Sequence, residues 1–236
     1  MPKSTKDMST PSKSMTDPSV VCWSCHEPAL RMHFCSNCGK LQQVRQDTDY
    51  FALLGMARKL WIDMGELEQK FLQLSWKLHP DNFVNATPEE QELSLKHSSG
   101  LNDAYRVLRD PVARVEYLLE IEGTRKEGEQ KQQAPPELLE EVFELNESLD
   151  ELRQAKVGGG DLAALKSRLE SAQKNFQDKL GEVDAQLQAS ARRWDAASDA
   201  SSADADRKAI MVRLNELLNR RSYIRNLVNN VQKELQ

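Results

Sequence analysis

The chain has 236 residues, of which 39% are apolar and 29% are charged, a composition typical of a soluble, helix-rich protein. Its net charge of -5 disfavours nucleic acid as the main partner, because phosphate binding needs a basic surface. No apolar run approaches the roughly 20 residues that span a bilayer, and the N-terminus lacks the apolar core of a secretory signal. We therefore predict a cytoplasmic, bacterial protein that binds neither membrane nor nucleic acid, with the mitochondrial matrix as the alternative compartment.

The N-terminal part of the chain divides into a polar tail and a cysteine-rich segment. Residues 1–19 are rich in Lys, Ser, Thr and Pro and predict a disordered tail. Residues 20–45 hold all four cysteines in two C-x2-C pairs, namely Cys22, Cys25, Cys35 and Cys38. Four thiolates complete the tetrahedron that Zn²⁺ prefers, so this spacing predicts a structural zinc module. Two disulfides, four free thiols or an iron-sulfur cluster remain alternatives, and we expect neither His26 nor His33 to bind the metal.

Residues 46–122 predict a segment of four helical pieces. Its clearest element is an amphipathic helix whose apolar positions share one stripe, Leu67, Phe71, Leu74 and Leu78. Lys70, Gln73 and Lys77 form a second, polar stripe on the same helix. Pro80 cannot continue that helix, so His79 and Asp81 are expected to stand together in a turn.

A second long helix is predicted after this turn. Thr87, followed by Pro88 and two acidic residues, is typical of a helix N-terminus. His97 lies on the apolar face and is interpreted as a hydrogen-bonded core histidine. Gly100 is expected to allow close helix packing, and Asp110-Pro111 is expected to end this helix and to begin the next.

The C-terminal region predicts a three-helix bundle. A charged, Gln-rich linker is expected over 123–134, and three apolar stripes with helical spacing follow over 135–236. Residues 189–206, rich in Ala, Ser and Asp, are expected to loop out in part, with Trp194 as an anchor. Leu139 and Phe143 lie one step off the first apolar stripe beside a row of glutamates, an arrangement typical of a protein-binding face.

Two helices joined at His79-Pro80-Asp81 resemble the J domain of DnaJ-type co-chaperones. The runs 101–105 (LNDAY) and 110–119 (DPVARVEYLL) resemble the HscB branch, whose members serve iron-sulfur cluster assembly. This resemblance implies an all-α fold, in which a small zinc-knuckle module precedes a J-domain helical hairpin over 46–122 and the three-helix bundle. It also implies that the chain is not an enzyme. The corner, together with Lys70 and Lys77, would bind a DnaK/HscA-type ATPase chaperone and stimulate ATP hydrolysis there.

The segment 138–152 (LLEEVFELNESLDEL) resembles the part of HscB proteins that binds an IscU-like scaffold protein. The resemblance implies a set of scaffold-binding residues on the first and last helices of the bundle: Leu139, Phe143, Glu144, Glu147, Glu151 and Tyr223. Glu140 departs from the family pattern, where an apolar residue is familiar, so the apolar patch is expected to be smaller or shifted. The chain would then deliver its scaffold protein to the ATPase chaperone.

Other interpretations of these segments remain open. The protein could be a general J protein whose zinc module binds another protein or nucleic acid. The two lysines could form an ordinary solvated face, and Leu139 and Phe143 could pack under the linker. A metal-dependent or thiol enzyme is weaker, because the four cysteines would fill their own coordination shell.

Overall fold

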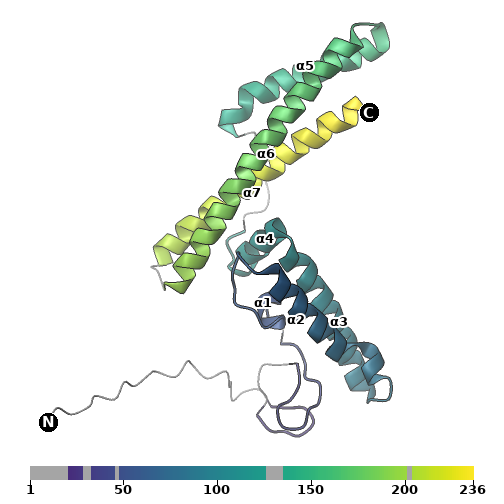
Figure 1. The fold of residues 1–236 in the computed structure, drawn as a ribbon, viewed down its shortest axis with the longest axis vertical. Coiled ribbons are helices and arrows are strands. Elements are labelled where there is room, and N and C mark those ends of the chain that lie inside the picture. The colour runs from purple at the N-terminus through teal and green to yellow at the C-terminus, as the bar shows by residue number, and fades with distance from the viewer. Residues whose placement is uncertain (1–20, 29–32, 46–47, 126–134, 201–203) are drawn as a thin grey trace, which may run out of the picture. The chain divides into compact units, whose positions relative to one another are not determined.

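The computed structural model describes residues 21–28, 33–45, 48–125, 135–200 and 204–236. The predicted tail and residues 126–134 of the predicted linker lie outside these ranges. The α-helices are α1 (Tyr50–Leu53), α2 (Met64–Leu78), α3 (Pro88–Arg109), α4 (Pro111–Ile121), α5 (Leu139–Gly158), α6 (Leu162–Asp199) and α7 (Asp204–Leu235) (Figure 1). The described ranges also contain the 3-10 helices η1 (Pro80–Phe83) and η3 (Pro136–Leu138). Within the described ranges, no helix combines the length and apolar character that crossing a membrane requires.

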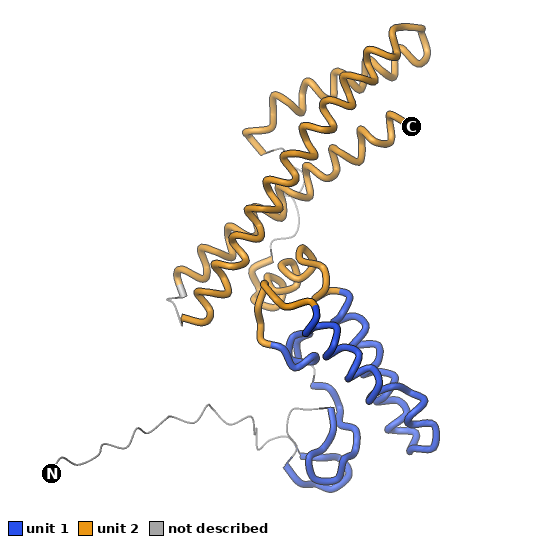
Figure 2. Tube along the Cα trace, in the orientation of Figure 1, with its two compact units in different colours: residues 1–56, 65–106 blue, residues 57–64, 107–236 orange. Residues whose placement is uncertain are grey.

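The chain folds into two compact units. Unit 1 comprises Met1–Met56 and Gly65–Arg106, and unit 2 comprises Ala57–Met64 and Val107–Gln236 (Figure 2). The short segment 57–64 therefore belongs to unit 2, although the chain on both sides of it belongs to unit 1. The predicted domain boundaries stay predictions.

Unit 1 contains an antiparallel helical hairpin. Phe71 of α2 stacks on Tyr105 of α3 with ring centroids 4.2 Å apart. At the other end of α2, the hydroxyls of Ser94 and Ser98 donate to the carbonyl oxygen of Leu78 at 2.8 and 3.1 Å. Later residues of α2 therefore contact earlier residues of α3, so the two helices are antiparallel. The predicted helical hairpin is present.

The start and the middle of α3 follow the sequence pattern. The backbone N–H of Glu90 bonds to the Thr87 hydroxyl, and that hydroxyl bonds to the Glu90 carboxylate, each at 3.3 Å. The first contact is the N-cap half of a capping box, and it satisfies a free backbone donor of the first turn. His97 is buried, as expected of a core histidine. Leu53 of α1 packs against Gly100, where a Cβ would lie 3.4 Å from its methyl group.

Unit 2 contains the predicted three-helix bundle. Ion pairs join Glu151 to Arg168 at 3.1 Å and Glu141 to Lys179 at 2.8 Å, so α5 and α6 are antiparallel. Helix α7 returns along α6, and its C-terminal half also borders α5 through a 2.7 Å ion pair between Arg153 and Glu234. The buried core of the bundle comes from all three helices and includes Leu145, Leu152, Leu169, Phe176, Val183, Leu187, Leu214, Leu217, Ile224 and Val231.

The expectation of a loop within residues 189–206 is wrong for its first part, because α6 continues without a break to Asp199. Trp194 is buried, in agreement with its predicted role as an anchor, and Asp195 beside it is 8% exposed. The Asp195 carboxylate accepts hydrogen bonds from the backbone N–H groups of Leu60 at 2.8 Å and Trp61 at 2.7 Å. The polar composition of this stretch thus belongs to a helix that packs against the segment 57–64.

Segment 57–64 is held within unit 2 by further polar contacts. The guanidinium of buried Arg114 donates to the carbonyl oxygens of Leu60 and Leu108, both at 2.6 Å. The guanidinium of Arg192 lies 4.2 Å from the ring centre of Trp61. Both the N–H and the C=O of Leu60 are therefore bonded to charged side chains, which fixes the backbone of this connector.

Candidate functional site

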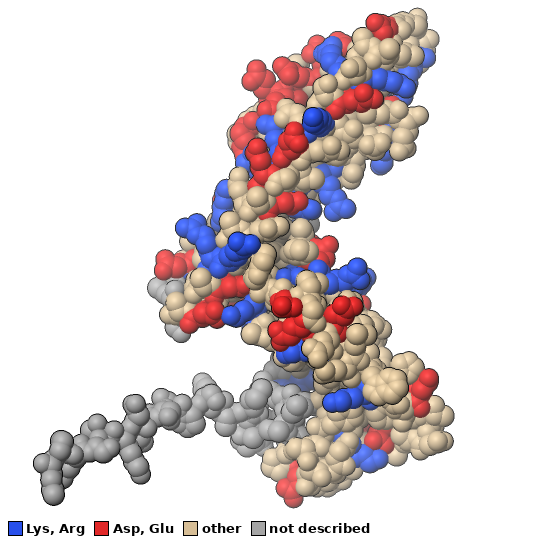
Figure 3. Space-filling view, viewed as in Figure 1, with Lys and Arg blue, Asp and Glu red and all other residues tan. Residues whose placement is uncertain are grey.

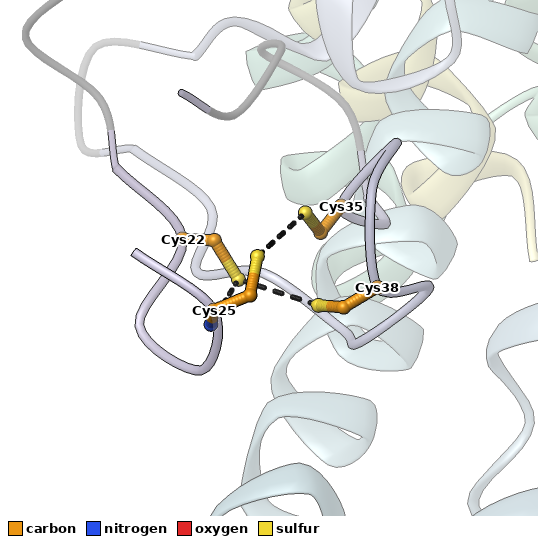
Figure 4. Close-up of side chains that lie close together, drawn as sticks. All are labelled: Cys22, Cys25, Cys35 and Cys38. Carbon is orange, nitrogen blue, oxygen red and sulfur yellow. Dashed lines mark hydrogen bonds between the residues drawn. The ribbon is translucent and has the colours of Figure 1, made fainter. Parts of the chain in front are cut away.

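The four predicted metal ligands converge on one point. Their sulfur atoms all lie within 4.8 Å of one another, with Cys22 and Cys38 3.6 Å apart and Cys25 and Cys35 3.7 Å apart (Figure 4). Four Zn–S bonds of about 2.3 Å in a tetrahedron would place the sulfur atoms about 3.8 Å apart. The donor set therefore fits one tetrahedral ion of thiolate preference, and all four cysteines are free thiols.

Two similar backbone turns bring these sulfur atoms together. In each turn, the N–H of the first cysteine donates to the carbonyl oxygen five residues later, at 2.9 Å for Cys22 and 2.8 Å for Cys35. The N–H four residues later donates back to that cysteine, from His26 and from Gly39. His26 and Gly39 have φ values of 59° and 72°, in the left-handed region. The pair of turns thus forms a twofold-repeated knuckle around the sulfur cluster.

Backbone and side-chain donors favour the thiolate form of Cys22. The N–H groups of Ser24 and Cys25 point at its sulfur at 3.4 and 3.5 Å, and the Gln42 side-chain amide does so at 3.3 Å. Burial raises the pKa of Cys22, but these backbone donors together with the Cys38 and Cys25 side chains outweigh burial and lower it to about 6. The thiolate is the metal-binding form, so these donors favour a bound cation at Cys22. At Cys38 the hydrogen bond from the Lys40 backbone lowers the pKa, but burial and the neighbouring thiols outweigh it and raise the pKa to about 12.

The cysteine module is also bonded to the helical hairpin of unit 1. The ring nitrogens of His33 lie 2.9 Å from the Leu53 carbonyl oxygen and 3.1 Å from Nδ1 of His97. Nε2 of His97 lies 2.7 Å from the Gln42 carbonyl oxygen. Both nitrogens of His33 are therefore occupied away from the sulfur cluster, as expected if it does not bind the metal. An ion pair of 2.8 Å between Lys40 and Glu90 adds a fourth contact.

The predicted corner stands at the closed end of the hairpin, in the connection between α2 and α3. His79 caps η1, its Nδ1 accepting a hydrogen bond from the N–H of Asp81 at 3.3 Å, and both side chains are exposed. The side-chain amide of Asn82 donates to the carbonyl oxygen of Trp76 at 2.6 Å, which ties the turn to the last turn of α2. Pro80 occupies the first position of η1, where its missing N–H costs nothing. The corner is thus a rigid and accessible turn.

The two lysines predicted beside the corner differ in their surroundings. Lys70 donates to the Gly55 carbonyl oxygen at 2.6 Å and pairs with Glu66 at 3.1 Å. Lys77, in the last turn of α2, is exposed. Only Lys77 therefore presents its charge near the corner without first leaving an intramolecular hydrogen bond.

The predicted scaffold-binding residues of α5 are largely exposed. Leu139 is 54% exposed and Phe143 is 71% exposed. Glu144 and Glu147 are also exposed, whereas Glu151 is half-buried and pairs with Arg168 of α6. Acidic side chains gather over α5 in the space-filling view (Figure 3). The structure thus offers an apolar pair with an acidic border; residues 126–134 of the linker, under which both side chains could pack, lie outside the described ranges.

Tyr223 lies on α7 near the start of α5. Arg220, one turn before it, forms a 2.9 Å ion pair with Glu137 just ahead of α5, and α7 runs parallel to α5 from there. This register places Tyr223 level with the first turn of α5, close to the height of Leu139. Tyr223 is half-buried, and burial raises its pKa.

One surface feature of α2 was missed by the sequence interpretation. Trp76 is 80% exposed and Leu72, one turn earlier, is 58% exposed. Their spacing of four residues was visible in the sequence, but the helix was assigned one apolar stripe and one polar stripe only. A third, outward face of α2 therefore carries two exposed apolar residues, Leu72 and Trp76.

Comparisons with known proteins point to one family. A family model described as the HSCB C-terminal oligomerisation domain matches residues 134–232. The iron-sulfur cluster co-chaperone protein HscB homolog of Arabidopsis thaliana is 30% identical over 162 residues, which are 69% of this chain and 62% of that protein. The chain thus spans less than two thirds of the length of this curated relative.

Solved structures agree with this similarity. The human co-chaperone protein HscB has a TM-score of 0.62 and 26% identity, covering 91% of this chain and 98% of that one. The chaperone HscB from Vibrio cholerae has a TM-score of 0.52 and 24% identity, covering 79% and 96%, and supports the fold alone. The predicted all-α fold and the resemblance to the HscB branch are confirmed.

Proposed function

We propose that this chain is a member of the HscB family and a co-chaperone of iron-sulfur cluster assembly that joins a scaffold protein to an ATPase chaperone. Its hairpin would bind a DnaK/HscA-type chaperone, and its C-terminal bundle would bind an IscU-like scaffold protein. The observation that carries the proposal is the rigid, exposed His79-Pro80-Asp81 corner in a chain that also exposes Leu139 and Phe143. The compartment stays a prediction.

The corner would act by binding and not by chemistry of its own. The side chains of His79 and Asp81 are exposed to solvent at the end of the hairpin, whereas catalytic chemistry usually needs a site that excludes water. Pro80 and the contact from Asn82 to Trp76 hold the turn in one conformation, so that little entropy is lost when a partner binds. ATP hydrolysis would take place in the partner, and this chain would favour the partner's hydrolysing state.

The face of α5 would select the scaffold protein. Phe143 and Leu139 offer apolar surface that a partner can bury, at about 25 cal/mol per Å². Glu144 and Glu147 border this surface and would fix the orientation of a partner that carries basic groups. Tyr223, level with the first turn of α5, would extend the same face.

The four-cysteine module would hold a structural Zn²⁺. Cys22, Cys25, Cys35 and Cys38 supply all four ligands of a tetrahedral ion, which leaves no position for a substrate. The ion would cross-link the two cysteine turns. The module's contacts to α3 through His33 and Lys40 would then pass this rigidity to the hairpin.

The test is steady-state ATP hydrolysis by a purified DnaK/HscA-type chaperone, measured with and without an IscU-like scaffold protein. We expect the wild-type chain to stimulate hydrolysis and His79→Gln to abolish stimulation. Replacing Leu139 and Phe143 together by alanine should remove only the additional stimulation that depends on the scaffold.

Val212→Ala is the matched control for the double variant. Val212 is a 54% exposed apolar residue of α7 outside the proposed face. Its replacement should therefore leave ATPase stimulation unchanged both with and without the scaffold protein. Stimulation by His79→Gln equal to that of the wild type would exclude the proposed function of the hairpin. Equal calorimetric affinity of the double variant and the wild type for the scaffold would exclude the α5 face.

A further inference from the structure

Helix α2 carries an apolar stripe that faces solvent and leads to the corner. Leu72 and Trp76 are the exposed members of this stripe, and His79 follows three residues after Trp76. At about 100° per residue, positions 72, 76 and 79 fall within about 60° of one another on the helix surface. A partner that contacts His79 therefore meets Trp76 before it meets any residue of the lysine stripe.

The charges of α2 do not favour an electrostatic contact. The helix holds two glutamates, Glu66 and Glu68, and two lysines, Lys70 and Lys77, so its side chains carry no net charge. Lys70 is already bonded to Gly55 and Glu66 within the chain. An exposed ion pair formed by the remaining lysine is worth at most about 1 kcal/mol. The basic stripe thus offers little affinity for an acidic partner.

Trp76 is held in a fixed relation to the corner. Its carbonyl oxygen accepts the 2.6 Å hydrogen bond from Asn82, the residue that directly follows the His79-Pro80-Asp81 motif. The indole therefore projects from a rigid last turn and not from a frayed helix end. Tryptophan is the residue most enriched among interface positions that dominate binding, because it buries a large area with few rotatable bonds.

We propose that Leu72 and Trp76 are an apolar anchor, which binds an apolar depression on the ATPase domain of the DnaK-class chaperone beside the site that receives His79. This inference rests on the proposed function, and it names the chemistry of the contact. The association is then driven by burial of apolar surface, so it persists at high ionic strength. A charge-steered contact through the lysines would weaken steeply with salt.

The first test titrates the full-length, metal-loaded chain against the chaperone and reads the concentration that gives half-maximal ATPase stimulation. Trp76→Ala should raise this concentration about tenfold or more, and Leu72→Ala should raise it by less. The maximal rate at saturation should stay that of the wild type, because the corner itself is intact. Val212→Ala, which removes a 54% exposed apolar side chain elsewhere, should leave the half-maximal concentration unchanged.

Trp76→Arg distinguishes an apolar contact from an electrostatic one, because the two predict opposite changes in binding affinity. If the partner surface beside His79 is apolar, an arginine at this position weakens binding at least as much as alanine does. If that surface is acidic, the arginine strengthens binding, and the proposal is overturned. For the wild-type chain, raising KCl from 50 to 500 mM should change the half-maximal concentration by less than about threefold, and a loss above tenfold would also overturn it.

Failure of this proposal is distinguishable from failure of the proposed function. If the wild-type chain gives no stimulation at all, the function is wrong. If the wild type stimulates, His79→Gln does not, and Trp76→Ala matches the wild type, only the anchor is wrong. A change in self-association by sedimentation, or in binding to anionic vesicles, with the ATPase titration unaffected, would assign Trp76 to a second copy of the chain or to a membrane and would likewise overturn the anchor.

Discussion

Replacing Asp195 by alanine should destabilise the protein strongly, although Asp195 belongs to no proposed binding site. The carboxylate is nearly buried and accepts hydrogen bonds from the backbone N–H groups of Leu60 and Trp61. A hydrogen bond to a charged group contributes about 1.5–3 kcal/mol, and a donor left buried without a partner costs a similar amount. We therefore expect Asp195→Ala to lower the free energy of unfolding by about 3–5 kcal/mol.

The matched control is Asp199→Ala, one helical turn later. Asp199 forms an ion pair of 2.8 Å with Lys59, but its side chain is 61% exposed, so its loss should cost less than about 1 kcal/mol. Urea unfolding followed by far-UV circular dichroism would measure both variants. Equal costs for the two, or a cost below about 1 kcal/mol for Asp195→Ala, would refute the reasoning from burial.

The remaining two predictions concern the cysteine module and its contacts. Chelation should release one Zn²⁺ per chain, measured by mass spectrometry. It should also speed amide hydrogen exchange in α3 around His97, because His33 and Gln42 would no longer hold the His97 ring in place. Unchanged exchange would contradict this coupling. Burial lowers the pKa of His97 below its usual 6.5, so the folded state favours the neutral ring. The contribution of neutral His97 to the free energy of unfolding is complete above about pH 6.5 and is lost as the pH falls below that value. The thermal midpoint should therefore fall from pH 7 to pH 5 by more in the wild type than in His97→Gln, and identical pH profiles would argue against a role of His97.

Local signals in the sequence predicted much of the fold and of the candidate site. The spacing of the cysteine pairs was sufficient to predict the sulfur cluster, because each turn is closed by hydrogen bonds within six residues. The corner at Pro80 was predictable because proline restricts its own backbone and that of the preceding residue. The three apolar stripes of the C-terminal region predicted the bundle because the period of an α-helix is fixed.

Features that depend on distant partners were not predictable in this way. Residues 189–199 read as a loop because their composition is polar, yet Asp195 is buried by a segment 135 residues earlier in the chain. Exposure of Trp76 was equally hidden, because a tryptophan next to an apolar stripe is more often part of a core. In both cases burial of the side chain depends on tertiary contacts that the local sequence pattern does not specify.

The attachment of segment 57–64 to α6 has a consequence for protein engineering. A fragment that ends before α6 would contain the whole helical hairpin but would leave the Leu60 and Trp61 N–H groups without their acceptor and Trp61 without Arg192. A chimera that exchanges hairpins between relatives would meet the same mismatch at the connector. A hairpin should therefore be transferred together with a compatible α6 that carries Asp195. Grafts should be designed for the hairpin and α6 at the same time.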